Sequence, residues 1–388
     1  MKDSILVADA KIMQDGSKIY AIDMYCNNIY SINLKTNRIE IIGEISDEEE
    51  KIYTVFVLHV CKDKLVMQPR NGKYIHVFDL EEKRDSIYDI GERVWDVDDI
   101  YNSFSLCYEE NLYMFHRRSG LALKCDYYEN NIQKIETSKS YEKIEITDFF
   151  IIEDTMYMHC RFLNKIIVYS VINEEIKEIP LSDELKGELI NVYKIDEYIV
   201  AYHDKNRKVF LFDNQGKFLK KYDVPFKKNQ IDPFVYRLGN MVIILGNSGG
   251  EVCQIDIESD CVKGKTICEL SNVDVACIGE YSDYLFCFQI NKLNERIINY
   301  CIRIDKKNLE VAIDELEFEA SSTEAEIELK YNQNISRQIL EKSVCEERNK
   351  FYLKNLLCHE DRIDTSYDNA LHEYGTLINE KIMMDLGR

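Results

Sequence analysis

Arginine residues recur at nearly constant spacing in the first half of the chain. Arg70, Arg117 and Arg161 are separated by 47 and 44 residues. The planar guanidinium group binds carboxylate and phosphate groups through paired hydrogen bonds. If one structural repeat carries each arginine, we expect the three side chains to lie at the same height on one face of the fold. The spacing therefore predicts a binding site for a small acidic ligand, such as a phosphorylated sugar, an acidic glycan or an acidic peptide.

Four further residues complete this predicted ligand-binding set. His116 and Arg118 adjoin one of the arginines, and His203 holds a corresponding place in a later copy of the repeat. Trp95, the only tryptophan, lies in an acidic loop, where an indole suits stacking on the face of a sugar. The alternatives stay open: the arginines pair with local acids such as Asp96–Asp99, and the indole fills a gap between repeats.

Motifs for catalysis and for metal binding are missing from the pattern. His116 and His203 lie two repeats apart, and no acidic residue is in register with both. The sequence has no serine nucleophile elbow, glycine-rich phosphate loop or metalloprotease helix motif. Its 13 cysteines occur singly, so we expect reduced structural thiols and no zinc site. We therefore predict no catalytic residue, no metal and no cofactor.

A repeat of about 43 to 47 residues sets the register of these side chains. An early apolar residue marks each copy, and the markers are Ile19, Leu65, Leu112, Met156, Ile199, Val242 and Leu285. Alternation of Tyr, Phe, Ile and Val with polar residues predicts four short strands in each copy. In the fourth copy we expect them at 144–152, 156–159, 166–171 and 175–180, and we place the innermost strand of the first copy at 4–8.

Four strands in a repeat of this length are typical of a propeller blade. Over about residues 1–318 the chain resembles the β-propeller superfamily, at the level of architecture. It lacks the sequence motifs of kelch repeats and of tryptophan–aspartate repeats, and it has no aspartate boxes. We predict an all-β fold with seven blades, or six if a terminal copy is degenerate. The expected blades span about 1–45, 46–91, 92–138, 139–182, 183–225, 226–268 and 269–318.

The repeat stops after Glu317, and residues 319–388 are predicted to form a helical C-terminal extension. Thr365 and Asp368 resemble a capping box, and apolar residues then recur at helical spacing up to Leu386. A helix at 365–388 that packs on the propeller is one interpretation. A helix that docks a protein partner is the other, because closing a propeller does not require an extension.

The composition excludes several classes of function. The 70 acidic and 49 basic side chains give a net charge of −21, which argues against a nucleic-acid partner. No apolar stretch is long enough to span a membrane, and no secretory signal is expected, so we predict a cytoplasmic protein. The predicted function is a non-catalytic scaffold that binds a ligand or a protein. A propeller enzyme acting on carbohydrate, as hydrolase or lyase, and a structural subunit of an assembly are the alternatives.

Overall fold

The computed structural model describes the propeller part of the chain. The described residues belong to the compact unit Met1–Ser322. They are 7–13, 15–23, 28–45, 55–69, 74–89, 103–116, 121–127, 131–136, 146–152, 155–161, 163–170, 172–173, 175–181, 183–186, 190–227, 230, 233–290 and 296–318. The predicted helical extension at 319–388 lies outside them.

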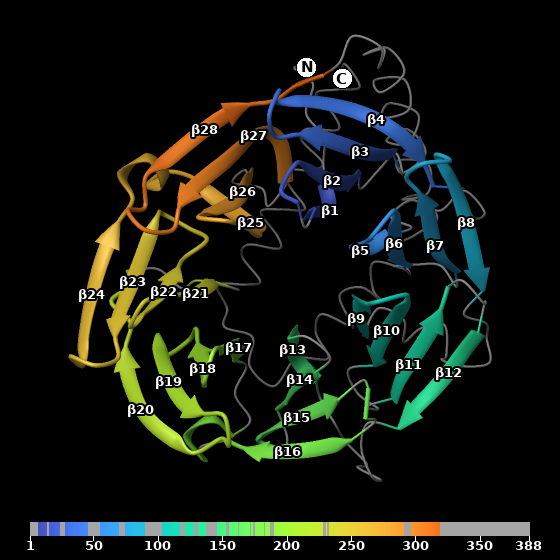
Figure 1. Ribbon diagram of the computed structural model, residues 1–388. Helices are drawn as coiled ribbons and strands as arrows, with labels where there is room; N and C mark the ends of the chain where they lie inside the picture. Colours follow the sequence, from blue (N-terminus) through green and yellow to red (C-terminus); the bar gives the residue numbers. More distant parts are fainter. Residues whose placement is uncertain are drawn as a thin grey trace, which may run out of the picture. The chain divides into compact units, whose positions relative to one another are not determined.

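Seven small antiparallel sheets form a ring, each with its first strand innermost (Figure 1). The predicted seven-bladed β-propeller is therefore confirmed. Blades 1 to 3 contain β1 (Val7–Ile12), β2 (Lys18–Asp23), β3 (Asn28–Asn33) and β4 (Arg38–Glu44); β5 (Val55–Cys61), β6 (Lys64–Pro69), β7 (Tyr74–Asp79) and β8 (Arg84–Asp89); and β9 (Ser103–Tyr108), β10 (Asn111–His116), β11 (Leu121–Asp126) and β12 (Asn131–Glu136).

Blades 4 to 7 follow the same order along the chain. They contain β13 (Ile146–Ile152), β14 (Thr155–Cys160), β15 (Lys165–Ser170) and β16 (Ile176–Pro180); β17 (Asn191–Ile195), β18 (Tyr198–His203), β19 (Lys208–Asp213) and β20 (Phe218–Asp223); β21 (Phe234–Leu238), β22 (Met241–Leu245), β23 (Glu251–Asp256) and β24 (Cys261–Thr266); and β25 (Asp274–Tyr281), β26 (Tyr284–Ile290), β27 (Arg296–Asp305) and β28 (Val311–Glu315). Short 3-10 helices lie at Asp183–Leu185 and Cys268–Leu270.

The strand predictions for the fourth copy agree with β13 to β16 to within two residues. The prediction for the first copy is wrong at its end, because β1 continues to Ile12, four residues past the expected end at position 8. Antiparallel pairing explains the difference, since β1 stays in register with β2 up to the pair Ile12 and Ile19.

Strands with both faces buried explain the abundance of Tyr, Phe and Ile. In β18, Ile199 and Ala201 face an apolar cluster shared with blade 4, whereas Val200 and Tyr202 face one shared with blade 6. Six such clusters in the described residues each combine side chains of two neighbouring blades. The core is thus a series of interfaces between blades, and burial of apolar surface there holds the ring together.

The ring closes through the end of the repeat region. After blade 7, β29 (Glu317–Phe318) pairs in parallel with β4, so the sheet of blade 1 has five strands. Leu316 is buried in the cluster shared by blades 7 and 1, and Phe318 packs against it. Closure therefore rests on an added outer strand and on an apolar anchor.

Candidate functional site

The predicted ligand-binding residues fall mostly outside the described part of the chain. This applies to Arg70, Trp95, Arg117 and Arg118. Of the other three, His116 is the last residue of β10, Arg161 directly follows β14, and His203 ends β18. These positions share one end of the second strand in their blades, as the repeat register predicts. The convergence of the full set stays a prediction.

The environments of Arg161 and His203 differ. His203 is 2% exposed, and its Nδ1 accepts a hydrogen bond of 3.0 Å from the Asn206 amide in the turn that follows. Arg161 is partly exposed. Burial lowers the pKa of the neighbouring His159 to about 3, and the positive charge of Arg161 lowers it further. In the described structure His203 thus supports its turn, while Arg161 presents its charge nearer the surface.

A buried glutamine fixes the loops on the same face of blades 5 and 6. Gln230 is fully buried, and its Oε1 accepts a hydrogen bond of 2.9 Å from the Ser248 amide. Its Nε2 donates to the Ser248 carbonyl and to the Glu251 carboxylate. Gly249 and Gly250 have positive φ, as expected for a turn. This network was not predictable from the sequence, because a lone glutamine in a loop carries no periodic signal.

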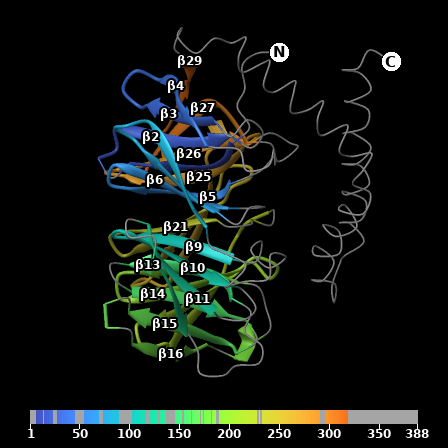
Figure 2. The same ribbon diagram turned by 90° about the vertical axis from the view of Figure 1, so that its right-hand side faces the viewer.

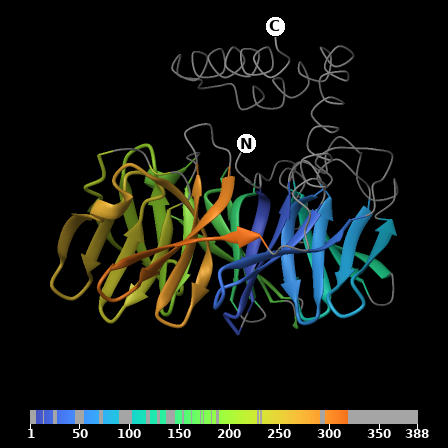
Figure 3. The same cartoon turned by 90° about the horizontal axis from the view of Figure 1, so that it is seen from above.

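The opposite face is formed by the turns that join the first and second strands. In most of the described blades these turns carry exposed carboxylates close to the central channel. We call them the acidic rim: Asp15, Asp63, Glu109, Glu110, Asp196, Glu197 and Asp283. The two-residue turns repeat a backbone conformation, since their first residues Lys62, Glu109, Asp196 and Ser282 all have φ between 45° and 56°. The repeat therefore places these residues in corresponding turns of their blades. Figure 2 and Figure 3 show the ring from the side, with the strands running from one face to the other and turns at both faces.

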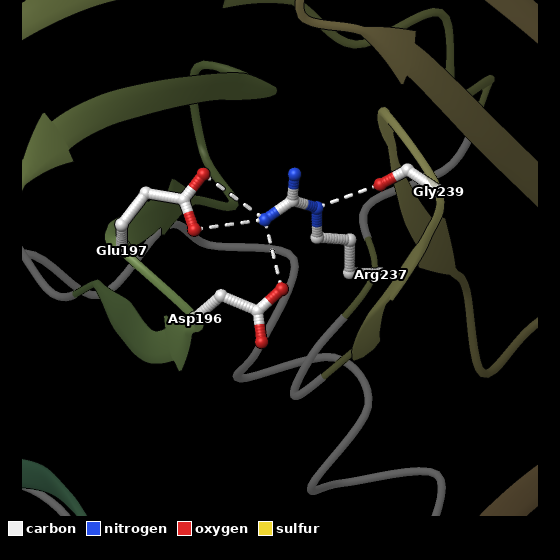
Figure 4. Close-up of polar contacts among 4 residues, drawn as sticks. All are labelled: Asp196, Glu197, Arg237 and Gly239. Carbon is white, nitrogen blue, oxygen red and sulfur yellow. Dashed lines mark hydrogen bonds and ion pairs between the residues drawn. The ribbon is translucent and has the colours of Figure 1, made fainter.

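Blade 6 contributes a cation to this rim. Arg237, at the end of β21, donates from Nη1 to Asp196 Oδ2 at 2.8 Å and to both Glu197 oxygens at 3.0 and 3.1 Å (Figure 4). Its Nε donates to the Gly239 carbonyl at 2.7 Å, and the guanidinium lies 5.5 Å from the Tyr198 ring centroid. Partial burial alone would lower the pKa of Arg237, but the two carboxylates raise it overall. A rim turn and its tyrosine thus form a receptor for a guanidinium.

Two lysines also contact the rim, at Glu110 and Asp283. Lys62 pairs with Glu110 of the next blade at 3.0 Å, and Lys307 pairs with Asp283 at 2.9 Å. All four side chains are more than half exposed, so each pair is weak. Lys35 also interacts electrostatically with Asp15, and Lys194 with Asp196 and Glu197. Among these described residues, seven acids stand against five cations, and the rim keeps a small excess of negative charge.

Tyrosines border the rim in blade 7. Tyr281 and Tyr284, on either side of the Ser282–Asp283 turn, are 39% and 43% exposed. The Tyr281 ring packs on Gly16 of blade 1, where a Cβ atom would lie only 2.1 Å from the ring. Carboxylates beside exposed aromatic rings are suited to cationic side chains, through ion pairing and cation–π contact.

The wall of the channel holds a second polar group, on the inner strands of blades 1 to 3. His59 Nε2 and Ser105 Oγ share a hydrogen bond of 2.9 Å between β5 and β9. Burial lowers the pKa of His59 to about 3, and the charge of Lys11 adds to this effect. A histidine with so low a pKa is a weak base at neutral pH. The contact therefore joins two blades and does not activate the serine.

The prediction that all cysteines are reduced is wrong for one pair. Cys61 of β5 and Cys107 of β9 form a disulfide between blades 2 and 3. Sequence reasoning missed it because the pair is 46 residues apart, and only the packing of adjacent blades brings the two strands together. Seven other cysteines whose side chains are described form no disulfide. Within the described residues, no group of three or more His, Cys, Asp or Glu side chains is arranged to hold a metal ion.

Comparisons with known proteins support the fold. No protein-family model and no curated protein match the chain. Among solved structures, an inactive virginiamycin B lyase from Staphylococcus aureus is 11% identical, with a TM-score of 0.54 over 76% of this chain and 94% of that one. Hsv2 of Kluyveromyces lactis is 9% identical, with a TM-score of 0.51 over 81% and 98%. U3-55K is 11% identical, with a TM-score of 0.51 over 78% and 96%.

At such low identity, these similarities establish the propeller architecture and leave the function to the site. None of the described helices has the length and apolar character needed to cross a membrane.

Proposed function

We propose that this protein is a binding propeller whose acidic rim receives a basic segment of a protein partner. The observation that carries the proposal is the repetition of exposed carboxylates at one turn of successive blades. Such a ring of like charge attracts an oppositely charged segment and orients it before contact. Exposed Tyr281 and Tyr284 add aromatic surface on which lysine or arginine side chains can pack.

The contacts of Arg237 support a preference for guanidinium groups. Two carboxylates and one aromatic ring of blade 5 already surround this side chain. Two of the rim acids, Asp15 and Glu197, have pKa values below the ordinary range of their side chains. Hydrogen bonding from the Ser17 amide lowers the pKa of Asp15, and hydrogen bonding to its own amide lowers that of Glu197. Permanently charged carboxylates suit binding of cations better than general acid catalysis.

Binding of a labelled oligo-arginine peptide to the full-length protein tests the proposal. The rim variant Glu109→Gln/Glu110→Gln/Glu197→Gln should bind the peptide about tenfold more weakly, because each lost exposed charge removes a fraction of a kcal/mol. Fluorescence anisotropy at increasing salt measures the affinity, and the difference should shrink as salt screens the charges.

An equally charged control separates the rim from general acidity. The variant Glu81→Gln/Glu82→Gln/Glu258→Gln removes three exposed carboxylates from outer turns, so its net charge matches that of the rim variant. We expect it to bind almost as tightly as the unmodified protein. If both variants bound the peptide equally weakly, binding would depend only on the net charge of the protein, and the rim proposal would fail.

We further propose that the opposite face binds a small acidic ligand through the arginines of the repeat register. Partly exposed Arg161, at the end of β14, supports this second candidate. Phosphorylated sugars and acidic glycans should raise the thermal midpoint of the protein, since a ligand of the folded state stabilises it by mass action. The double variant Arg117→Ala/Arg161→Ala should lose the shift. A shift that survives the substitution would reject these arginines as ligands.

A further inference from the structure

The Cys61–Cys107 disulfide joins two blades at the wall of the channel. Cys61 is the last residue of β5 and Cys107 is the next-to-last residue of β9, with Cα atoms 6.7 Å apart. Each strand pairs by backbone hydrogen bonds only within its own blade in the described sheets. A covalent bond at this place therefore connects two sheets that are otherwise held by side-chain packing and side-chain hydrogen bonds.

The surroundings of the pair hold the blades together whether or not the bond is formed. Cys61 and Cys107 lie in the apolar cluster of blades 2 and 3, next to Leu112 and Leu123. His59 and Ser105, two residues before the cysteines in each strand, share a hydrogen bond. Reduction would thus remove one link of several, and the ring would stay folded.

Four buried cysteines contrast with this pair, whereas Cys261, which is partly exposed, and Cys268, which is exposed, form no disulfide. Cys125 lies in the same apolar cluster, and burial raises the pKa of its thiol to about 12, so it stays protonated and unreactive. Burial has the same effect on Cys160, Cys253 and Cys301. Cys107, in contrast, is partly exposed, while Cys61 is buried at 7%. A thiol in solution reaches the disulfide from the Cys107 side.

We propose that Cys61 and Cys107 form a reversible redox clamp that locks blades 2 and 3 together at the channel wall. Reduction needs two equivalents of a small thiol. The first thiolate attacks Cys107 Sγ, the Cys61–Cys107 bond breaks, and Cys61 leaves as a thiolate that takes up a proton. The second thiol attacks the mixed disulfide and releases Cys107 as a thiol, so the small thiol ends as its own disulfide. Oxidation is the reverse, with a small-molecule disulfide as the oxidant.

The clamp controls the spacing of two rim turns. Cys61 directly precedes the turn Lys62–Asp63, and Cys107 lies two residues before the turn at Glu109 and Glu110. In the oxidised form the inner strands move as one unit. In the reduced form the two strands keep their packing, but local opening of the strands becomes more frequent. This inference does not depend on peptide binding, because thiol content and amide exchange report it directly.

Equilibration of the folded, full-length protein in glutathione buffers tests the clamp. Buffers rich in oxidised or in reduced glutathione set the redox state, and trapped thiols are then alkylated and mapped by mass spectrometry. We expect Cys61 and Cys107 to be linked in the first buffer and both alkylated in the second, with full return on exchange. Hydrogen exchange in peptides covering 55–61 and 103–108 should be severalfold faster in the reduced form.

Two variants make the result specific. Cys61→Ser should show the fast exchange in both buffers, whereas Cys125→Ser, from the same cluster, should still switch. Failure of the Cys61–Cys107 link to form in the oxidising buffer would overturn the proposal. A link that resists reduction in the folded protein would also overturn it, since the bond would then be a permanent structural one.

Discussion

At the scale of single residues, one partly buried and one fully buried histidine make the fold sensitive to acid. The pKa values of His59 and His159 are lowered from 6.5 to about 3, in both cases chiefly by burial. Below pH 6.5 the unfolded chain takes up protons that the folded state does not, so stability falls as the pH decreases toward 3. Each histidine should cost about 2 kcal/mol of stability between pH 6.5 and pH 5.

The substitution His59→Gln should remove its share of this loss. Glutamine does not titrate, and its side chain amide can keep the hydrogen bond with Ser105. Urea unfolding between pH 7 and pH 5 measures the effect, and the variant should lose about 2 kcal/mol less than the unmodified protein over this range. Parallel stability curves for the two proteins would show that His59 is protonated in the folded state.

Arg237 is the second residue whose role can be isolated. Its guanidinium group forms ion pairs with the carboxylates of Asp196 and Glu197, whose side chains are 65% and 53% exposed. The variant Arg237→Gln should therefore lose only about 0.5–1 kcal/mol of stability. If the rim binds guanidinium groups, the variant should also bind the oligo-arginine peptide severalfold more tightly than the unmodified protein does, because the two carboxylates become available. Lys83→Gln, in an outer turn, is the control for the change in net charge, and equal gains in both variants would contradict a specific receptor.

At the scale of the element, the turn between the third and fourth strands repeats a capping motif. Asn33, Asp79, Asp213, Asp256 and Asp305 end the third strands of their blades, and their Oδ1 atoms accept hydrogen bonds from amides two to four residues later. Such side chains substitute for backbone partners in a tight turn. Asn or Asp ends six of the seven third strands, and only β15 ends differently, at Ser170, so this recurrence is a sequence signal for the turn.

Asn33→Ala tests the motif in blade 1. The substitution removes the oxygen that accepts hydrogen bonds from the Lys35 and Thr36 amides. We therefore expect the free energy of unfolding, measured with urea, to fall by about 1 kcal/mol. Asn33→Asp keeps the acceptor oxygen and should stay close to the unmodified protein. Equal stability of the alanine and aspartate variants would show that water replaces the side chain at no cost.

At the scale of the whole molecule, closure of the ring depends on the residues after blade 7. Leu316 is 7% exposed in the cluster between blades 7 and 1, and Leu316→Ala should cost about 2–4 kcal/mol. Ile313→Ala, in β28, removes a side chain that is 50% exposed and should change stability by less than about 0.5 kcal/mol. Thermal unfolding compares the two, and similar effects would contradict an anchoring role for Leu316.

The architecture was predictable because its signals are local. Alternating apolar residues define a strand within six residues, and the markers from Ile19 to Leu285 show the repeat without knowledge of the packing. The same register correctly placed Arg161 and His203 at the ends of second strands. Burial of His203 was not predictable, because a histidine at a strand end has the same pattern whether it faces solvent or a neighbouring turn.

The sequence by itself determined the seven blades, their four strands and the acidic composition, since period-two alternation and repeat length act within one blade. Only the tertiary structure decided which residues of different blades are in contact. Arg237 meets Asp196 and Glu197, Cys61 meets Cys107, and β29 pairs with β4. Each contact joins residues at least 40 positions apart, and it forms because the curvature of the ring brings particular strands together. That geometry is a property of the packed blades, and no single repeat contains it.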